Sequence, residues 1–164
     1  MTDEALKVYL DELVVQHNRL DFISDDPIQI PHQFSQLQDI EITGFWVAML
    51  AWGQRKTIIN KANELVKLMD NTPYDFIVNH TEKDRERFLT FKHRTFQATD
   101  TLYFLEFLQQ FYRQYDSLET AFLAPNLMDD ETVEPALIHF QKQFFSLPNA
   151  PKRTQKHIAT PTRN

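Results

Sequence analysis

The sequence contains no cysteine and very little glycine. Without cysteine, the chain of 164 residues can form neither a disulfide framework nor a thiolate metal site. Its 2 glycines, Gly44 and Gly53, are too few for a glycine-rich phosphate-binding loop of the usual kinds. Runs of β-branched residues are also few, and this scarcity, together with that of glycine, favours helices over strands.

Long apolar runs and N-terminal targeting signals are absent as well. No run approaches the ~20 apolar residues of a membrane-spanning helix. The N-terminus, MTDEALKVYL, begins with acidic residues and lacks the basic region of a signal peptide. We therefore expect no membrane partner and a cytoplasmic location.

Length and composition predict a single all-α domain. Hydrophobic residues make up 42% of the chain and aromatic residues 13%, so disorder is not expected. We expect an irregular bundle of about six to eight helices over residues 1–147, with a long proline-containing connection over residues 19–38. Pro27 and Pro31 in this connection push the residues before them out of helical geometry.

Residues 148–164 are expected to form an irregular, basic, proline-rich tail. This tail has no acidic residue, although the whole chain has a net charge of −6. A basic tail on an acidic body can mark contact with nucleic acid, but it can equally be a solvated chain end. Its basic residues are Lys152, Arg153, Lys156 and Arg163.

The chain is organised around residues 39–69, which predict two helices joined by a tight turn. Residues 40–52 are apolar on nearly every side, so the first helix should be the buried centre of the bundle. Asp39 is its predicted N-cap, and Gly44 inside it indicates close approach of a neighbouring helix. Gly53 falls where the apolar pattern stops, as expected of a left-handed C-terminal cap of the helix.

The second helix of this pair should be amphipathic, with Thr57 as its N-cap. Its apolar residues recur at helical spacing from Ile58 to Met69, which places them on one face. Further helices are expected wherever a capping residue precedes another apolar stripe. The candidate caps are Thr2, Thr72 (before Pro73), Thr81, Asp100, Ser117 and either Asp130 or Thr132.

The sequence contains no recognisable catalytic constellation. None of the six histidines is paired at the spacing of a metal site, and His139 is best explained as packing at the edge of the core. No nucleophile, base and acid occur in a suggestive arrangement. We therefore predict no catalytic residue, no metal site and no cofactor in this chain.

Two basic segments are candidates for contact with phosphate groups. Gln54, Arg55 and Lys56 precede a helix, whose free N–H groups and positive dipole end suit an anion. Lys92, His93 and Arg94 lie between two phenylalanines, and bases interleaved with aromatics suit nucleic acid. Each segment also has an ordinary explanation, as a common helix start or as cations that flank core rings. The candidate nucleic-acid-binding residues are Gln54, Arg55, Lys56, Lys92, His93, Arg94, Lys152 and Arg153.

Several runs along the chain resemble one bacterial family of conserved proteins whose function is unknown. The two specific runs are Leu50-Ala51-Trp52-Gly53-Gln54-Arg55 and His93-Arg94-Thr95-Phe96. The other runs are Ser24-Asp25-Asp26-Pro27-Ile28, Pro31-His32, Asp39-Ile40-Glu41, Ser117-Leu118-Glu119 with Phe122, and His157-Ile158-Ala159-Thr160-Pro161.

That family in turn looks like a remote relative of the helix-hairpin-helix DNA glycosylases of base-excision repair. Those enzymes are all-helical, and an early helix with a glutamine near its end is similar to Ala48–Gln54 here. Family members continue beyond Asn164, where the helix-hairpin-helix and the acidic glycosylase-like segment lie. The resemblance therefore implies that this chain is a truncated, N-terminal portion, onto which no catalytic residue can be carried over.

Two functions of different classes are expected from these observations. The first is the N-terminal portion of a DNA-glycosylase-like protein that contacts the DNA backbone without catalysis of its own. The alternative is a structural or protein-interaction module, in which an exposed apolar face recruits a partner or a second copy. An independent enzyme is the least favoured of the possibilities, because no catalytic constellation is present.

Overall fold

The computed structural model describes residues 1–123, 132–158 and 160. Over these residues the regular structure is entirely helical, apart from one isolated bridge between His93 and Phe96, so the all-α prediction is confirmed. None of the described helices is both long and apolar enough to span a bilayer. The predicted cap Asp130, the basic Arg163, and Ala159 and Pro161 of the closing run lie outside the described residues.

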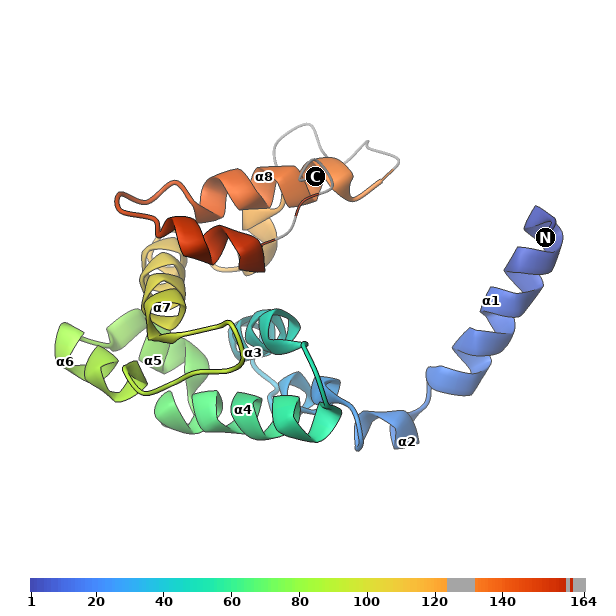
Figure 1. Cartoon of the computed structure of the whole chain (residues 1–164), viewed down its shortest axis with the longest axis horizontal. Coiled ribbons are helices and arrows are strands. Elements are labelled where there is room, and N and C mark those ends of the chain that lie inside the picture. The colour runs from blue at the N-terminus through green and yellow to red at the C-terminus, as the bar shows by residue number, and fades with distance from the viewer. Residues whose placement is uncertain (124–131, 159, 161–164) are drawn as a thin grey trace.

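The helices are arranged around α3 and α7, with α1 standing apart (Figure 1). The α-helices are α1 (Asp3–His17), α2 (Leu20–Ile23), α3 (Leu37–Leu50), α4 (Arg55–Leu68), α5 (Pro73–Asn79), α6 (Glu82–Arg85), α7 (Ala98–Tyr112) and α8 (Glu134–Phe144). Short 3₁₀ turns connect them: η1 (Pro27–Gln29), η2 (Pro31–Gln33), η3 (Glu86–Phe88), η4 (Leu118–Ala121) and η6 (Lys152–His157).

Aromatic side chains form the centre of the core. Phe104 of α7 is fully buried, and its ring contacts aromatic rings from two other helices and from one loop. The ring-centroid distances are 5.3 Å to Phe45 and 5.0 Å to Trp46 of α3, 5.2 Å to Phe96 and 4.7 Å to Phe144 of α8. Ring pairs at such separations stabilise a core beyond the area that they bury.

Two carboxylates at the start of α3 hold the neighbouring elements in place. Asp39 accepts a hydrogen bond of 2.7 Å from the backbone N–H of Tyr74, at the start of α5. Glu41 accepts hydrogen bonds from the Tyr112 hydroxyl at 2.9 Å, the Ser117 hydroxyl at 2.6 Å and the Leu118 backbone N–H at 2.9 Å. The prediction of Asp39 as the cap of its own helix is wrong, because α3 begins earlier, at Leu37.

Several other predicted helix starts are confirmed. The hydroxyl groups of Thr2, Thr81 and Ser117 each accept a backbone N–H at the start of the expected helix. Pro73 occupies the first turn of α5, directly after Thr72. Asp100 lies in the first turn of α7 instead of before it, and its carboxylate accepts the N–H of the preceding cap, Gln97, at 2.9 Å.

The N-terminal helix differs most from the expectation of a packed bundle. The cap at Thr2 agrees with the sequence and α1 ends at His17, but none of the residues of α1 is buried. Its apolar residues are open to solvent, with exposed fractions of 40% for Leu6, 52% for Tyr9 and 49% for Leu10. In Figure 1 this helix, in dark blue, extends away from all the others.

The proline-containing connection is more regular than an extended segment. It contains α2, η1 and η2, and the last of these turns occupies Pro31–Gln33. Ile30 anchors the connection in a small cluster with Val47 of α3 and with Ala62 and Val66 of α4.

Part of the C-terminal tail packs against the body. The Thr154 hydroxyl in η6 is fully buried and donates a hydrogen bond of 2.7 Å to Asp100 at the start of α7. Ile158 belongs to the main hydrophobic cluster and is only 4% exposed. The described part of the tail therefore contributes to the core around α7 and α8.

A buried histidine closes the junction between α5, α6 and α7. The Nε of Arg85 donates to Nε2 of His80 at 2.9 Å, and Nδ1 of His80 lies 2.9 Å from the carbonyl of Ile77. Because a guanidinium can only donate, Nε2 must accept and the ring must be neutral. Burial, and then the positive charge of Arg85, lower the pKa of His80 below its usual value.

We predict that the protein loses stability as the pH falls below about 6.5. Below this pH, His80 is protonated in the unfolded chain but stays neutral in the folded chain. The free energy of unfolding therefore falls by up to about 1.4 kcal/mol per pH unit. The pKa of His157 is also lowered, mainly by burial, and adds to the effect. The check is the melting temperature between about pH 7.5 and pH 5.5. His80→Gln should flatten its pH dependence, the exposed control His17→Gln should not, and a flat wild-type profile would contradict the prediction.

Candidate nucleic-acid interface

The turn between α3 and α4 is built on a glycine with positive φ. Helix α3 ends at Leu50, and Gly53 has a φ of +113°, which side-chain-bearing residues rarely adopt. The positive φ expected of Gly53 is therefore confirmed, but its prediction as the C-terminal cap of the helix is wrong, because α3 ends at Leu50 and its cap is Ala51. This turn brings the backbone of residues 51–54 to the surface, immediately before α4.

The two predicted basic segments meet at this turn. His93 Nε2 lies 3.1 Å from the backbone carbonyl oxygen of Trp52, although 41 positions separate the two residues. Arg94 has a φ of +52° in the tight turn between His93 and Phe96. A Cβ atom placed on Gly53 would lie 2.5 Å from Nη1 of Arg94, so the guanidinium rests against the glycine backbone.

The C-terminal tail contacts the same loop, at residues 95–97. Arg153 donates to the backbone carbonyl of Thr95 at 3.0 Å and also hydrogen-bonds the side chain of Gln97. Its Nη2 lies 3.3 Å from the buried carboxylate of Asp100, so the charge of Arg153 is compensated. Arg153 therefore holds the loop in place, whereas the neighbouring Lys152 is exposed.

The structure thus brings His93 and Arg94 to the turn before α4 and Arg153 to the same loop as Arg94, and it gives the predicted residues different environments. His93 is 5% exposed and acts as a buried tie between the two loops. Arg55 lies 3.7 Å from Asp26 and stacks over the Phe22 ring at 5.5 Å. Within the described part of the chain, no carboxylate is within ion-pair distance of the exposed side chains of Lys56, Lys92, Arg94 and Lys152.

The start of α4 adds polar groups to this cationic surface. The prediction of Thr57 as the N-cap is wrong, because α4 begins at Arg55 and its N-cap is Gln54. The Gln54 side chain makes no capping hydrogen bond. Residues 54–57 are exposed, so the positive end of this 14-residue helix is open to solvent beside Lys56.

An exposed tryptophan completes the surface and was missed in the sequence. Residues 40–52 are apolar nearly all round, which predicts burial of the whole stretch, yet Trp52 is 68% exposed. Its position directly before Gly53, outside α3, was the available signal. Trp46, by contrast, is 2% exposed, as expected for the centre of the core.

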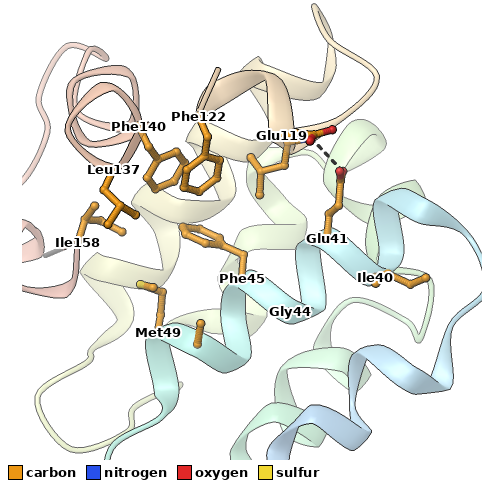
Figure 2. Close-up of a pocket in the computed structure, with 12 residues that line it drawn as sticks. Ile40, Glu41, Gly44, Phe45, Met49, Glu119, Phe122, Leu137, Phe140 and Ile158 are labelled. Atoms are coloured by element: carbon orange, nitrogen blue, oxygen red, sulfur yellow. Dashed lines mark hydrogen bonds between the residues drawn. The ribbon is translucent and has the colours of Figure 1, made fainter. Parts of the chain in front are cut away.

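Two hollows flank the outer face of α3. The first, which we call the α3–α8 pocket, has a volume of about 610 Å³ and is shown in Figure 2. It is lined mainly by apolar side chains: Ile40, Phe45, Met49, Leu118, Phe122, Leu137, Phe140 and Ile158, with Glu41 and Glu119 at its edge. The second, the α3–α4 pocket, also measures about 610 Å³, and its lining includes Pro27, Pro31, Ile40, Val47, Gly53, Arg55 and Ile58.

Neither hollow contains a set of metal ligands. Over the residues that the structure describes, no group of three or more histidine, cysteine, aspartate or glutamate side chains could hold a metal ion. The surface around Gly53 instead combines positive charge, outward N–H groups and one aromatic ring. Chemically, such a surface suits binding of an extended polyanion that carries flat apolar groups.

Gly44 differs from Gly53 and lies between the two hollows. The sequence predicts a neighbouring helix packed closely against Gly44, and this prediction is wrong for the described residues. A Cβ atom on Gly44 would meet only Cβ of Pro31, at an ordinary contact distance of 4.0 Å.

We predict opposite effects of alanine at the two glycines. Gly53→Ala forces positive φ on an L-residue and displaces the Arg94 guanidinium, so it should destabilise the protein by about 1–3 kcal/mol. Gly44→Ala should stabilise it by up to about 1 kcal/mol, because alanine is the better helix former. Urea unfolding of both variants checks the pair. A Gly53→Ala protein as stable as the wild type would mean that the turn tolerates another backbone geometry.

A protein family of unknown function matches most of the chain. The matched range, residues 26–164, begins after α1 and α2. No curated protein and no solved structure matches the chain. The expected resemblance to a family of unknown function is confirmed, whereas the more remote resemblance to glycosylases is not tested by this match. Since the match covers far more than half of the sequence, the chain belongs to DUF2400, a family of proteins of unknown function.

Proposed function

We propose that this chain is the N-terminal, non-catalytic portion of a DNA-glycosylase-like protein and contacts the nucleic-acid backbone. The observation that carries the proposal is the convergence of two basic segments at Gly53, with Arg94 against the glycine and Lys56 beside it. The proposal includes the expectation, taken from the resemblance, that the catalytic part belongs to a longer protein. A cytoplasmic location, expected from the sequence, is also part of the proposal.

The arrangement suits phosphate contact because the cations are available. Lys56, Lys92 and Arg94 are exposed: Lys56 lies in the first turn of α4, and Lys92 and Arg94 lie in the loop that contains His93. His93 contacts the Trp52 carbonyl just before α4, and Arg153 contacts Thr95 in the same loop as Arg94. Each phosphate that such a side chain neutralises releases condensed counterions, which is the main source of sequence-independent affinity. The N-terminus of α4 contributes further positive potential at the same place.

The exposed indole of Trp52 extends the contact to bases. Base stacking on an aromatic side chain contributes about 1–3 kcal/mol per base and tolerates any sequence. A duplex hides the faces of its bases, whereas a single strand or a distorted site presents them. The combination therefore favours single-stranded or locally opened nucleic acid over regular duplex.

The test is binding of fluorescently labelled single-stranded and duplex DNA at several salt concentrations between about 50 and 200 mM. Three neutralised phosphates predict a slope of log K against log salt of about −2 for single strands. Lys56→Gln, Lys92→Gln and Arg94→Gln should each reduce the slope by about 0.7. Lys67→Gln, at the opposite end of α4, is the matched control and should leave it unchanged. Salt-independent binding, or none by a folded chain, would refute the proposal.

A protein-interaction module is the second candidate, and the α3–α8 pocket is the observation that favours it. Phe122 and Phe140 stack there with a centroid distance of 4.1 Å, and Phe45 contacts Phe140 at 5.5 Å. Figure 2 shows these rings beside Met49 and Leu137 around an open space. An apolar hollow of this kind on a surface is a common mark of a contact site for another protein.

For this second candidate we predict that the folded chain binds a hydrophobic dye in the pocket. Met49→Glu places a charge at the edge of the hollow and should weaken dye binding at least fivefold, while far-ultraviolet circular dichroism stays the same. The exposed Leu89→Glu, outside the pocket, should have no effect on dye binding. Dye binding that is equal in all three proteins would argue against an accessible apolar pocket.

A further inference from the structure

The α3–α8 pocket carries charge of one sign only. Its lining contains no lysine, arginine or histidine, and its two charged side chains, Glu41 and Glu119, are both acidic. The ion pairs among the described residues all involve other side chains. Figure 2 shows the two glutamates at one end of the hollow and Leu137 and Ile158 at the other. A molecule that enters the hollow therefore meets apolar walls and an uncompensated negative edge.

The carboxylate of Glu41 is held in place and can accept one more hydrogen bond. It already accepts from the hydroxyls of Tyr112 and Ser117 and from the backbone N–H of Leu118. These three bonds use three of the roughly four acceptor positions of a carboxylate. All three donors are neutral, so they leave the negative charge of Glu41 without a counter-charge. A lysine or arginine N–H from another molecule would supply both the fourth bond and that charge.

Glu119 supplies a second negative charge that is accessible to solvent. It is exposed, and among the described residues its side chain makes neither a hydrogen bond nor an ion pair. An approaching cation can therefore pair with Glu119 without breaking an existing contact of the fold.

The apolar surface extends beyond the hollow along both helices. Leu37 and Ile40 share a face of α3 with Glu41, at helical spacings of four and one, and they are 54% and 37% exposed. Val133, at the start of α8, precedes Leu137 by four positions and is 73% exposed. A small molecule would fill the hollow and leave these side chains in water, whereas a protein segment would cover them as well. The extent of the surface therefore favours a protein segment.

We propose that the α3–α8 pocket binds a protein segment that presents apolar side chains together with at least one lysine or arginine. The apolar side chains fill the hollow, and the cation lies against Glu41 and Glu119. The same two carboxylates repel an acidic segment and a nucleic-acid backbone, which distinguishes this surface from the one around Gly53. The inference rests on the second candidate function and names the chemistry of the partner.

The test uses three labelled helical peptides and measures their binding to the full chain by fluorescence anisotropy. The first peptide carries leucines at positions i, i+3, i+4 and i+7, with lysines on the flanks of this apolar face. The second has glutamates in place of the lysines, and the third has glutamines in place of the leucines. We expect the first peptide to bind at least tenfold more tightly than either of the others. Equal affinity of the lysine and glutamate peptides would overturn the proposal, as would equal affinity of the peptide without leucines.

Charge reversal locates the contact. Glu119→Lys replaces an acid by a cation at the edge of the pocket and should reduce the preference for the lysine peptide at least fivefold. Glu12→Lys makes the same change of net charge on α1, which extends away from the body (Figure 1), and should alter the preference less than twofold. Equal effects of the two variants would mean that only the overall charge attracts the peptide, and would overturn the proposal.

The apolar wall and the hydrophobic dye separate this inference from the function on which it rests. Leu137→Gln, in the lining, should weaken the lysine peptide at least fivefold, whereas the exposed Leu89→Gln, outside the pocket, should not. Dye binding that Met49→Glu weakens, without a preference for the lysine peptide, would overturn the inference and leave the second candidate function standing. A folded chain that binds neither dye nor peptide would overturn both.

Discussion

The packing of Phe104 determines where the other elements can lie. Its ring touches aromatic side chains of α3, α8 and the loop before α7, so none of the three can shift without opening space beside it. Close-packed interiors tolerate little change of volume. Phe96 is one of these rings, and it closes the tight turn that contains His93 and Arg94. The position of the cationic surface is therefore set by the aromatic core.

Buried polar groups also stabilise the loop that carries His93 and Arg94. Asp100 has no solvent exposure, yet its carboxylate is shared between the Gln97 N–H, the Thr154 hydroxyl and the Arg153 guanidinium. A buried carboxylate is tolerated only when such partners replace water. The loop that carries Arg94 is thus held by an aromatic ring at Phe96 and by an ionic network just beyond it. A site on a loop fixed at both ends needs little reordering when a ligand binds.

The sequence predicts helices well where the signal is local. Thr2, Thr81 and Ser117 start their helices as expected, because a side-chain oxygen and a nearby N–H are sufficient. Asp39 and Thr57 have the same chemistry but lie inside their helices, since α3 and α4 begin earlier. The Asp39 carboxylate instead accepts the backbone N–H of Tyr74 at the start of α5. This is a tertiary contact, which no local sequence pattern can predict.

Long-range contacts explain what was missed at the candidate site. The two basic segments are visible in the sequence, but their meeting depends on the contacts from His93 to Trp52 and from Arg94 to Gly53. The exposure of α1 could not be predicted either, because an apolar pattern shows which face prefers burial and not whether anything covers it. For Trp52 the one signal was its position directly before Gly53. The same limit applies to Gly44, whose open surroundings belong to the packing of the whole chain.

The isolation of α1 also has a consequence for dynamics. Its helical structure depends on local interactions alone, the cap at Thr2 and the pair Lys7–Asp11, because no core contact supports it. A helix of this length without packing is only marginally stable in water. The amide protons of α1 should therefore exchange with solvent through local unwinding, at a rate that does not depend on global unfolding. The amide protons of α3 and α7 should exchange only when the whole protein unfolds. A partner that binds α1 should then slow amide exchange in that helix alone.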